Sequence, residues 1–74
     1  MKILITGVYG IVGSFLCNEL KTKHHIIGIG RKEKYDECQQ YYSCDITDKN
    51  AIEKVLKENK DIDIIIHCAA LAHN

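Results

Sequence analysis

The sequence contains no proline, no internal repeat and no low-complexity run, so nothing in it marks a linker or a second domain. Its 74 residues, 46% hydrophobic and 27% charged, predict one small, soluble, globular unit. A chain of this length buries only about 60% of the surface that its unfolded form exposes. Its stability is therefore expected to be marginal unless something else covers it.

The chain also carries no net charge. Its 10 basic and 10 acidic residues cancel, which removes the electrostatic basis for binding nucleic acid or an anionic membrane. The longest uncharged, mostly apolar stretch, residues 64–72, is far shorter than the roughly 20 residues of a membrane span. The first residues lack the apolar core and the cleavage site of a signal peptide. We expect a cytoplasmic chain.

The 4 cysteines include no Cys-x-x-Cys pair, and no paired His spacing accompanies them, so no metal site is predicted. An even count also fits two disulfides, but without a secretion signal the periodic apolar pattern favours free thiols. Cys17 and Cys68 are expected to be small buried apolar residues.

Short apolar and β-branched runs predict strands at residues 2–6, 25–29 and 62–68, and a weaker one at 40–44. A first helix is predicted between the first two strands, and a second begins at Thr47 as N-cap and runs to about Asn59. The first helix carries the apolar stripe Val12, Phe15, Leu16 and Leu20.

This alternation predicts an α/β fold with parallel strands joined by right-handed crossovers. The polar segment 30–38 is either a loop or a short surface helix. The implied strand order is 3-2-1-4, the first part of a doubly wound parallel sheet.

The strongest motif is TGVYGIVG at residues 6–13, with glycines spaced G-x-x-G-x-x-G between a predicted strand and a predicted helix. Gly7 permits the tight turn, Gly10 lets the backbone approach a pyrophosphate, and Gly13 lets the helix pack closely on the strands. The helix N-terminus supplies N–H groups and a positive dipole end to the phosphates. The alternative is that these glycines only accommodate a tight turn.

Three segments together resemble the N-terminal part of the extended short-chain dehydrogenase/reductase family, the NAD(P)-dependent nucleotide-sugar epimerases and dehydratases. They are ILITGVYGIVG at 3–13, DITD at 45–48 and DIIIHCAALAH at 63–73. The resemblance implies that residues 1–74 are the N-terminal portion of a Rossmann-like NAD(P)-binding domain whose catalytic and substrate-binding parts are absent.

The resemblance also assigns site residues. Asp45 would accept from the adenine amino group and Ile46 would offer an apolar wall, although Asp45 can instead be a cap before the second helix. Small residues after the last strand would let the cofactor pass, or would simply pack closely at a strand end. The pyrophosphate would be lined by Gly7, Gly10, Ile11, Val12 and Gly13, and the residues after the last strand are Ala69, Ala70 and Leu71.

Arg31 departs from the acidic residue that usually follows the second strand in NAD-preferring folds. Arginine there accommodates the 2′-phosphate of NADP, so NADP is favoured over NAD. Alternatively, Arg31 is simply solvated, and Glu33 or Asp36 contacts a ribose hydroxyl instead.

No catalytic residue is assigned. The Tyr-x-x-x-Lys pair of the family occurs nowhere in the chain, and His67 is expected to serve packing or backbone hydrogen bonding. The favoured interpretation is therefore an inactive N-terminal segment of a nucleotide-sugar enzyme, which would meet its substrate only in a full-length form. The alternative is a short nucleotide-binding or protein-interaction module. In both cases the exposed sheet predicts a homo-oligomer.

Overall fold

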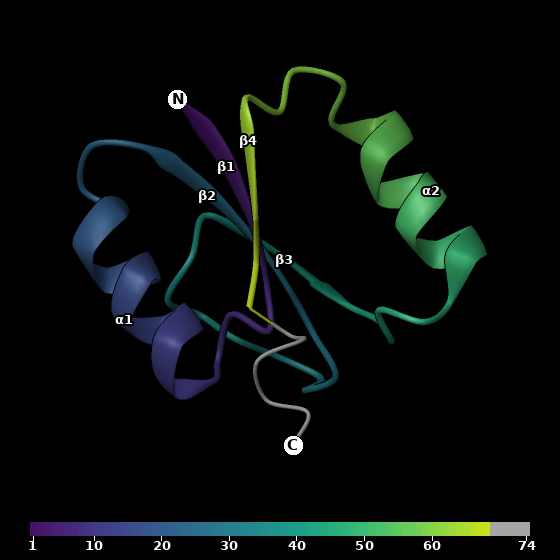
Figure 1. Ribbon diagram of the computed structural model, residues 1–74, viewed down its shortest axis with the longest axis horizontal. Helices are drawn as coiled ribbons and strands as arrows, with labels where there is room; N and C mark the ends of the chain where they lie inside the picture. Colours follow the sequence, from purple (N-terminus) through teal and green to yellow (C-terminus); the bar gives the residue numbers. More distant parts are fainter. Residues whose placement is uncertain (69–74) are drawn as a thin grey trace.

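The computed structural model describes residues 1–68 and contains a parallel sheet of four strands (Figure 1). The strands are β1 (Lys2–Thr6), β2 (His25–Gly30), β3 (Gln40–Ser43) and β4 (Ile64–His67). Their order is β3-β2-β1-β4, and every neighbouring pair is parallel. The α/β class and the order 3-2-1-4 are thereby confirmed, with the fourth strand shorter than expected.

One helix covers each face of this sheet: α1 (Ile11–Leu20) lies on one side and α2 (Lys49–Glu58) on the other (Figure 1). The segment between β2 and β3 contains no helix, so the loop alternative for residues 30–38 is the correct one. Within residues 1–68, neither helix is long and apolar enough to cross a bilayer.

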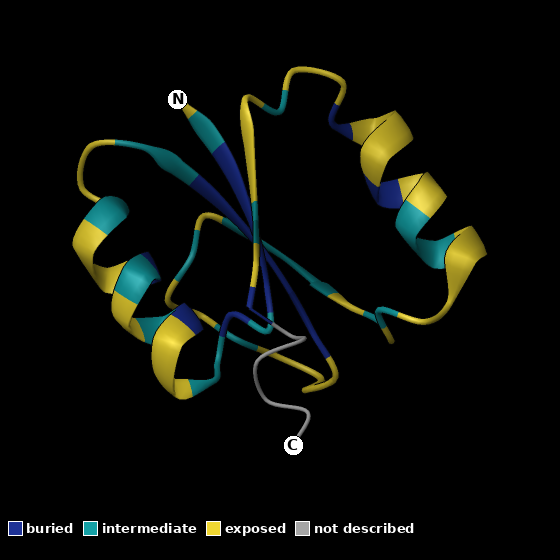
Figure 2. Ribbon diagram, viewed as in Figure 1, coloured by how far each residue is buried: buried dark blue, intermediate teal, exposed yellow. Residues whose placement is uncertain are grey.

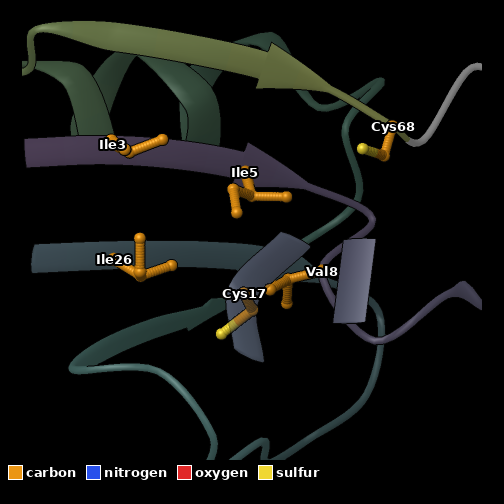
Figure 3. Packing of buried hydrophobic residues seen from close by; sticks show 6 residues of the cluster. All are labelled: Ile3, Ile5, Val8, Cys17, Ile26 and Cys68. Atoms are coloured by element: carbon orange, nitrogen blue, oxygen red, sulfur yellow. The ribbon is translucent and has the colours of Figure 1, made fainter. Parts of the chain in front are cut away.

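Most buried residues of the sheet lie in its two central strands, β1 and β2 (Figure 2). Alternation along the strands divides the core into two layers. Ile3 and Ile5 of β1 face α1, whereas Leu4 faces α2, because successive side chains of a strand point to opposite faces. The layer beneath α1 consists of Ile3, Ile5, Val8, Cys17, Ile26 and Cys68 (Figure 3). Cys17 and Cys68 are buried and all four cysteines are free, as expected.

Leu16 and Leu20 of the predicted stripe of α1 pack against the core, but the other two residues of the stripe do not. Val12 and Phe15 are 46% and 63% exposed, whereas Gly13 and Cys17 are buried. The cause is Gly13, where an added Cβ would lie only 2.9 Å from Val8 Cα. This close approach turns the face that contains Gly13 and Cys17 toward the sheet, so the stripe is displaced by about one position around the helix.

The N-cap of α2 is Asp48 rather than Thr47. The Asp48 side chain accepts a hydrogen bond from the Ala51 N–H, which is the N3 position of this helix. Thr47 instead donates both its N–H and its hydroxyl to Asp45. Thr47 and Asp48 are both of a residue type that caps helices, so the sequence alone does not decide between them. The hydrogen bonds of Thr47 to Asp45 leave Asp48 as the cap.

Candidate functional site

The turn between β1 and α1 is built on Gly7, which has a φ of +66°. Left-handed backbone of this kind favours glycine because a Cβ would crowd the following carbonyl. The Gly7 N–H donates to Ile29 O at 2.8 Å, and the Gly10 N–H donates to Gly7 O at 3.0 Å. The turn is therefore anchored to β2 and closed on itself.

The second and third glycines of the motif serve different purposes. At Gly13 an added Cβ would collide with the Gly7 carbonyl, so this glycine sets the approach of α1 to the turn. At Gly10 the backbone is extended, with φ −70° and ψ 175°, and a Cβ would lie 3.3 Å from Gly7 O. Gly10 is therefore not required by its backbone conformation, although a Cβ at this position would be in tight contact with the Gly7 carbonyl.

The N-terminus of α1 emerges directly from this turn. Gly10 is the N-cap, no side chain caps the helix, and its first turn contains no acidic residue. An α-helix leaves its first N–H groups without intrahelical partners and carries a partial positive charge at this end. Ile11 is 92% exposed and Val12 is 46% exposed, so this helix end is open to an anionic ligand.

The loops that follow β2 and β3 meet beside this turn, at the same edge of the sheet. Arg31 follows β2 directly, and its Nη2 lies 3.6 Å from Asp45 Oδ2. Both side chains are largely exposed, at 71% and 46%, so their ion pair adds little to stability. Its structural consequence is that the two residues predicted to contact the adenosine half of a cofactor are brought together.

Asp45 is held by three groups. Its Oδ1 accepts from the Thr47 N–H at 2.9 Å and from the Thr47 hydroxyl at 2.7 Å. These hydrogen bonds, and to a smaller degree Arg31, lower the pKa of the Asp45 carboxyl. The carboxylate is thus charged at neutral pH, and Oδ2 faces the guanidinium. Ile46 beside it is half-buried.

His67 makes a side-chain contact that its predicted packing role does not include. Its Nδ1 lies 2.7 Å from Thr6 Oγ1, and the two residues are register partners at the ends of β1 and β4. The expectation that His67 packs or bonds to the backbone is therefore wrong, because its hydrogen-bonding partner is the side chain of Thr6. Ala69, Ala70 and Leu71 lie outside the described residues.

Tyr9 lies beside the candidate site, a position that the glycine spacing does not predict. Its ring lies against Gly30, where an added Cβ would be 2.7 Å from Tyr9 Cδ2, and its hydroxyl accepts from the Arg31 N–H at 3.3 Å. The available signal was the pair Gly28 and Gly30 on one face of β2, because glycine in a strand marks the close approach of another group.

Comparison with known proteins decides the family. The model of the NAD dependent epimerase/dehydratase family matches residues 3–74. The chain belongs to this family. A UDP-glucose 4-epimerase from Streptococcus mutans is 29% identical over 77 residues, covering 95% of the chain and 23% of that protein. A dTDP-D-glucose 4,6-dehydratase from Dictyostelium discoideum is 34% identical over 86 residues, covering 97% of the chain and 20% of that protein.

Solved structures of related enzymes share the fold. A monomeric L-threonine 3-dehydrogenase from a metagenome, in its apo form, superposes with a TM-score of 0.76 at 36% identity, over 88% of this chain and 22% of its own. UDP-glucuronic acid 4-epimerase from Bacillus cereus, in complex with NAD, gives a TM-score of 0.66 at 28% identity, over 90% and 26%. The chain spans only 20% to 26% of the length of these four proteins.

The epimerase/dehydratase family uses NAD, and the glycine turn of this member fits such a cofactor. A pyrophosphate requires open N–H groups, a first helical turn without carboxylates and a backbone without a Cβ at the closest approach. Gly10 and the uncapped start of α1 meet all three requirements. Among residues 1–68, no three His, Cys, Asp or Glu side chains are grouped so as to hold a metal ion.

Proposed function

We propose that residues 1–74 are the N-terminal portion of an NAD(P)-binding Rossmann domain, the part that holds the adenosine and pyrophosphate of the cofactor. The observation that supports this most directly is the uncapped N-terminus of α1, which follows the glycine turn at the carboxyl edge of a parallel sheet. This edge is where open α/β sheets bind their ligands.

In this proposal the pyrophosphate rests on the glycine turn. Gly10 admits the phosphate oxygens to the backbone, and the first N–H groups of α1 donate to them. Gly13 acts indirectly, by keeping the helix end close to Gly7. The residues assigned to this part of the site, by contact or by positioning the helix, are Gly7, Gly10, Ile11, Val12 and Gly13.

The adenosine is assigned to the loops after β2 and β3. Asp45 Oδ2 would accept from the exocyclic amino group of adenine, since Oδ1 is already used by Thr47. Ile46 would supply an apolar wall, and Ala69, Ala70 and Leu71, which follow β4 in the sequence, would let the cofactor pass over the backbone. Arg31 replaces the acidic residue typical of NAD-preferring folds, which supports a preference for NADP.

The reaction class follows from the family. When bound, the nicotinamide of the cofactor supplies hydride transfer. The names of two relatives, UDP-glucose 4-epimerase and dTDP-D-glucose 4,6-dehydratase, indicate that those proteins act on nucleotide sugars. The chain contains no Tyr-x-x-x-Lys pair. We therefore expect no epimerase, dehydratase or reductase turnover from these 74 residues alone, and measurable turnover would contradict this.

Titration of the protein with NADPH and with NADH, followed by nicotinamide fluorescence, tests the site. Gly10→Ala should weaken both ligands by about tenfold or more, since it removes access to hydrogen bonds with a charged group. Arg31→Ala should weaken NADPH alone. Equal affinity of the unsubstituted protein for both ligands refutes the NADP preference, and binding of neither refutes the site.

A second candidate function, a module that associates through its sheet, is supported by β4. This strand lies at one edge of the sheet, and its Ile64 and Ile65 are 39% and 55% exposed. Open strand edges with apolar side chains pair readily with other chains. Sedimentation should then show a homo-oligomer, and a stable monomer would exclude it.

A further inference from the structure

Three tyrosines from separate segments pack side by side on the α1 face of the sheet. Tyr9 comes from the glycine turn, Tyr35 from the loop after β2, and Tyr41 from β3. The ring centroids of Tyr9 and Tyr35 are 6.4 Å apart, and those of Tyr35 and Tyr41 are 5.9 Å apart, with tilted rings in both pairs. Such geometry is attractive for aromatic pairs, so the row links the loop to the turn.

Hydrogen bonds from the same tyrosines fix the backbone of the first two loop residues. The Arg31 N–H donates to the Tyr9 hydroxyl at 3.3 Å, and the Tyr41 hydroxyl donates to the Lys32 carbonyl at 2.7 Å. The Lys32 ammonium lies over the Tyr9 ring, 5.4 Å from its centroid. A cation at this distance is attracted by the ring. Both cationic residues are thus held beside the glycine turn.

The charge balance at this place gives Lys32 a distinct role. Arg31 is paired with the Asp45 carboxylate, so the two together carry no net charge. A phosphate with two negative charges would meet only a neutral pair if Arg31 acted alone. Lys32 supplies the uncompensated positive charge, and the Tyr9 ring attracts its ammonium without neutralising it.

We propose that Tyr9 and Lys32 complete, with Arg31, a subsite for the 2′-phosphate of an adenosine ligand. Lys32 contacts the phosphate as a cation, and Tyr9 is a positioning residue that acts through Lys32 and the Arg31 backbone. This inference rests on the proposed dinucleotide site. It goes further because it assigns the decisive positive charge to Lys32 and assigns the positioning of Lys32 to Tyr9, a residue of the glycine turn.

The test compares adenosine 2′,5′-bisphosphate with adenosine 5′-monophosphate by calorimetric titration of the protein expressed from its complete coding frame. The ratio of the two affinities isolates the 2′-phosphate. Lys32→Ala should reduce this ratio by about tenfold, the loss of one hydrogen bond to a charged group, and leave the monophosphate affinity unchanged. The matched control is Lys34→Ala, an exposed lysine of the same loop, which should leave the ratio within twofold of its original value, about the effect of a surface charge.

The Tyr9 variants separate its two contacts. Tyr9→Phe keeps the ring beneath Lys32 and removes only the acceptor of the Arg31 N–H, so its ratio should fall less than that of Tyr9→Leu. Circular dichroism checks that Tyr9→Leu is folded; if it is not, Lys32→Ala and Tyr9→Phe decide the matter.

The opposing outcomes are distinct. If Lys32→Ala leaves the ratio unchanged, weakens both ligands equally, or has the same effect as Lys34→Ala, the subsite is refuted. If the unsubstituted protein binds the monophosphate and gains nothing from the 2′-phosphate, the subsite is refuted while the dinucleotide site stands. If it binds neither ligand, the proposed function is refuted together with the subsite.

Discussion

Gly13→Ala is expected to destabilise the fold even though alanine is the better helix former. In an unconstrained helix this change would stabilise by about 1 kcal/mol. At position 13, however, the new Cβ would lie 2.9 Å from Val8 Cα and 3.0 Å from Gly7 C, besides colliding with Gly7 O. These are backbone atoms that cannot rotate away, so the cost lies at the upper end of the overpacking range, about 3 kcal/mol.

The net loss for Gly13→Ala is then about 2 kcal/mol. A chain of 74 residues has a total stability of about 4 to 11 kcal/mol at typical values per residue, so the loss is between a fifth and a half of it. Urea unfolding followed by circular dichroism should show a midpoint lower by about 2 M, for a slope of about 1 kcal/mol per M.

The matched control for this change is Asn18→Ala, at an exposed position of the same helix, which should raise the midpoint slightly through helix propensity alone. A Gly13→Ala midpoint equal to or above that of the unsubstituted protein would refute the reasoning. It would mean that α1 can move away from the glycine turn without loss, and that Gly13 does not set its position.

Three further predictions concern stability. Asn59→Ala should lose about 1 to 3 kcal/mol in urea unfolding, because this buried side chain donates to Val55 O and to the Tyr42 hydroxyl. Asp48→Ala should lose about 1 kcal/mol as the N-cap of α2, and an equal or larger loss in Thr47→Ala would contradict the assignment. Burial raises the pKa of the Cys38 thiol from 9.0 to about 11. The unfolded thiol therefore ionises first, and stability should fall from about pH 9 to pH 11, a slope that Cys38→Ala reduces.

The sheet was predictable because its signals are local. The run KILIT of β1 and the alternation of strands and helices determine a parallel order through general connection rules. The orientation of α1 was not predictable from its pattern, because Val12 and Phe15 look as apolar as any core residue. What orients the helix is Gly13 against Val8, a contact whose tightness no periodicity encodes.

The site divides in the same way. The positions of the glycine turn and of Asp45 and Arg31 after their strands follow from motif spacing. The pairing of Arg31 with Asp45, the use of Thr47 by Asp45 and the place of the Tyr9 ring depend on how two loops approach one another. Such contacts between distant segments arise only after the strands are assembled. The one sequence signal for them is weak: glycines at the end of β2 leave room for the side chains of other segments.

With the roles proposed above, the Arg31–Asp45 ion pair would make recognition of the two parts of an adenosine ligand interdependent. A phosphate that drew the guanidinium toward itself would release Asp45 Oδ2, which would then accept more readily from an amino donor. Binding free energies of the base and of the phosphate should therefore not add, and removal of either side chain should change what the other contributes. An exposed ion pair that adds little to stability would in this way couple the binding of the adenine base to the binding of the phosphate.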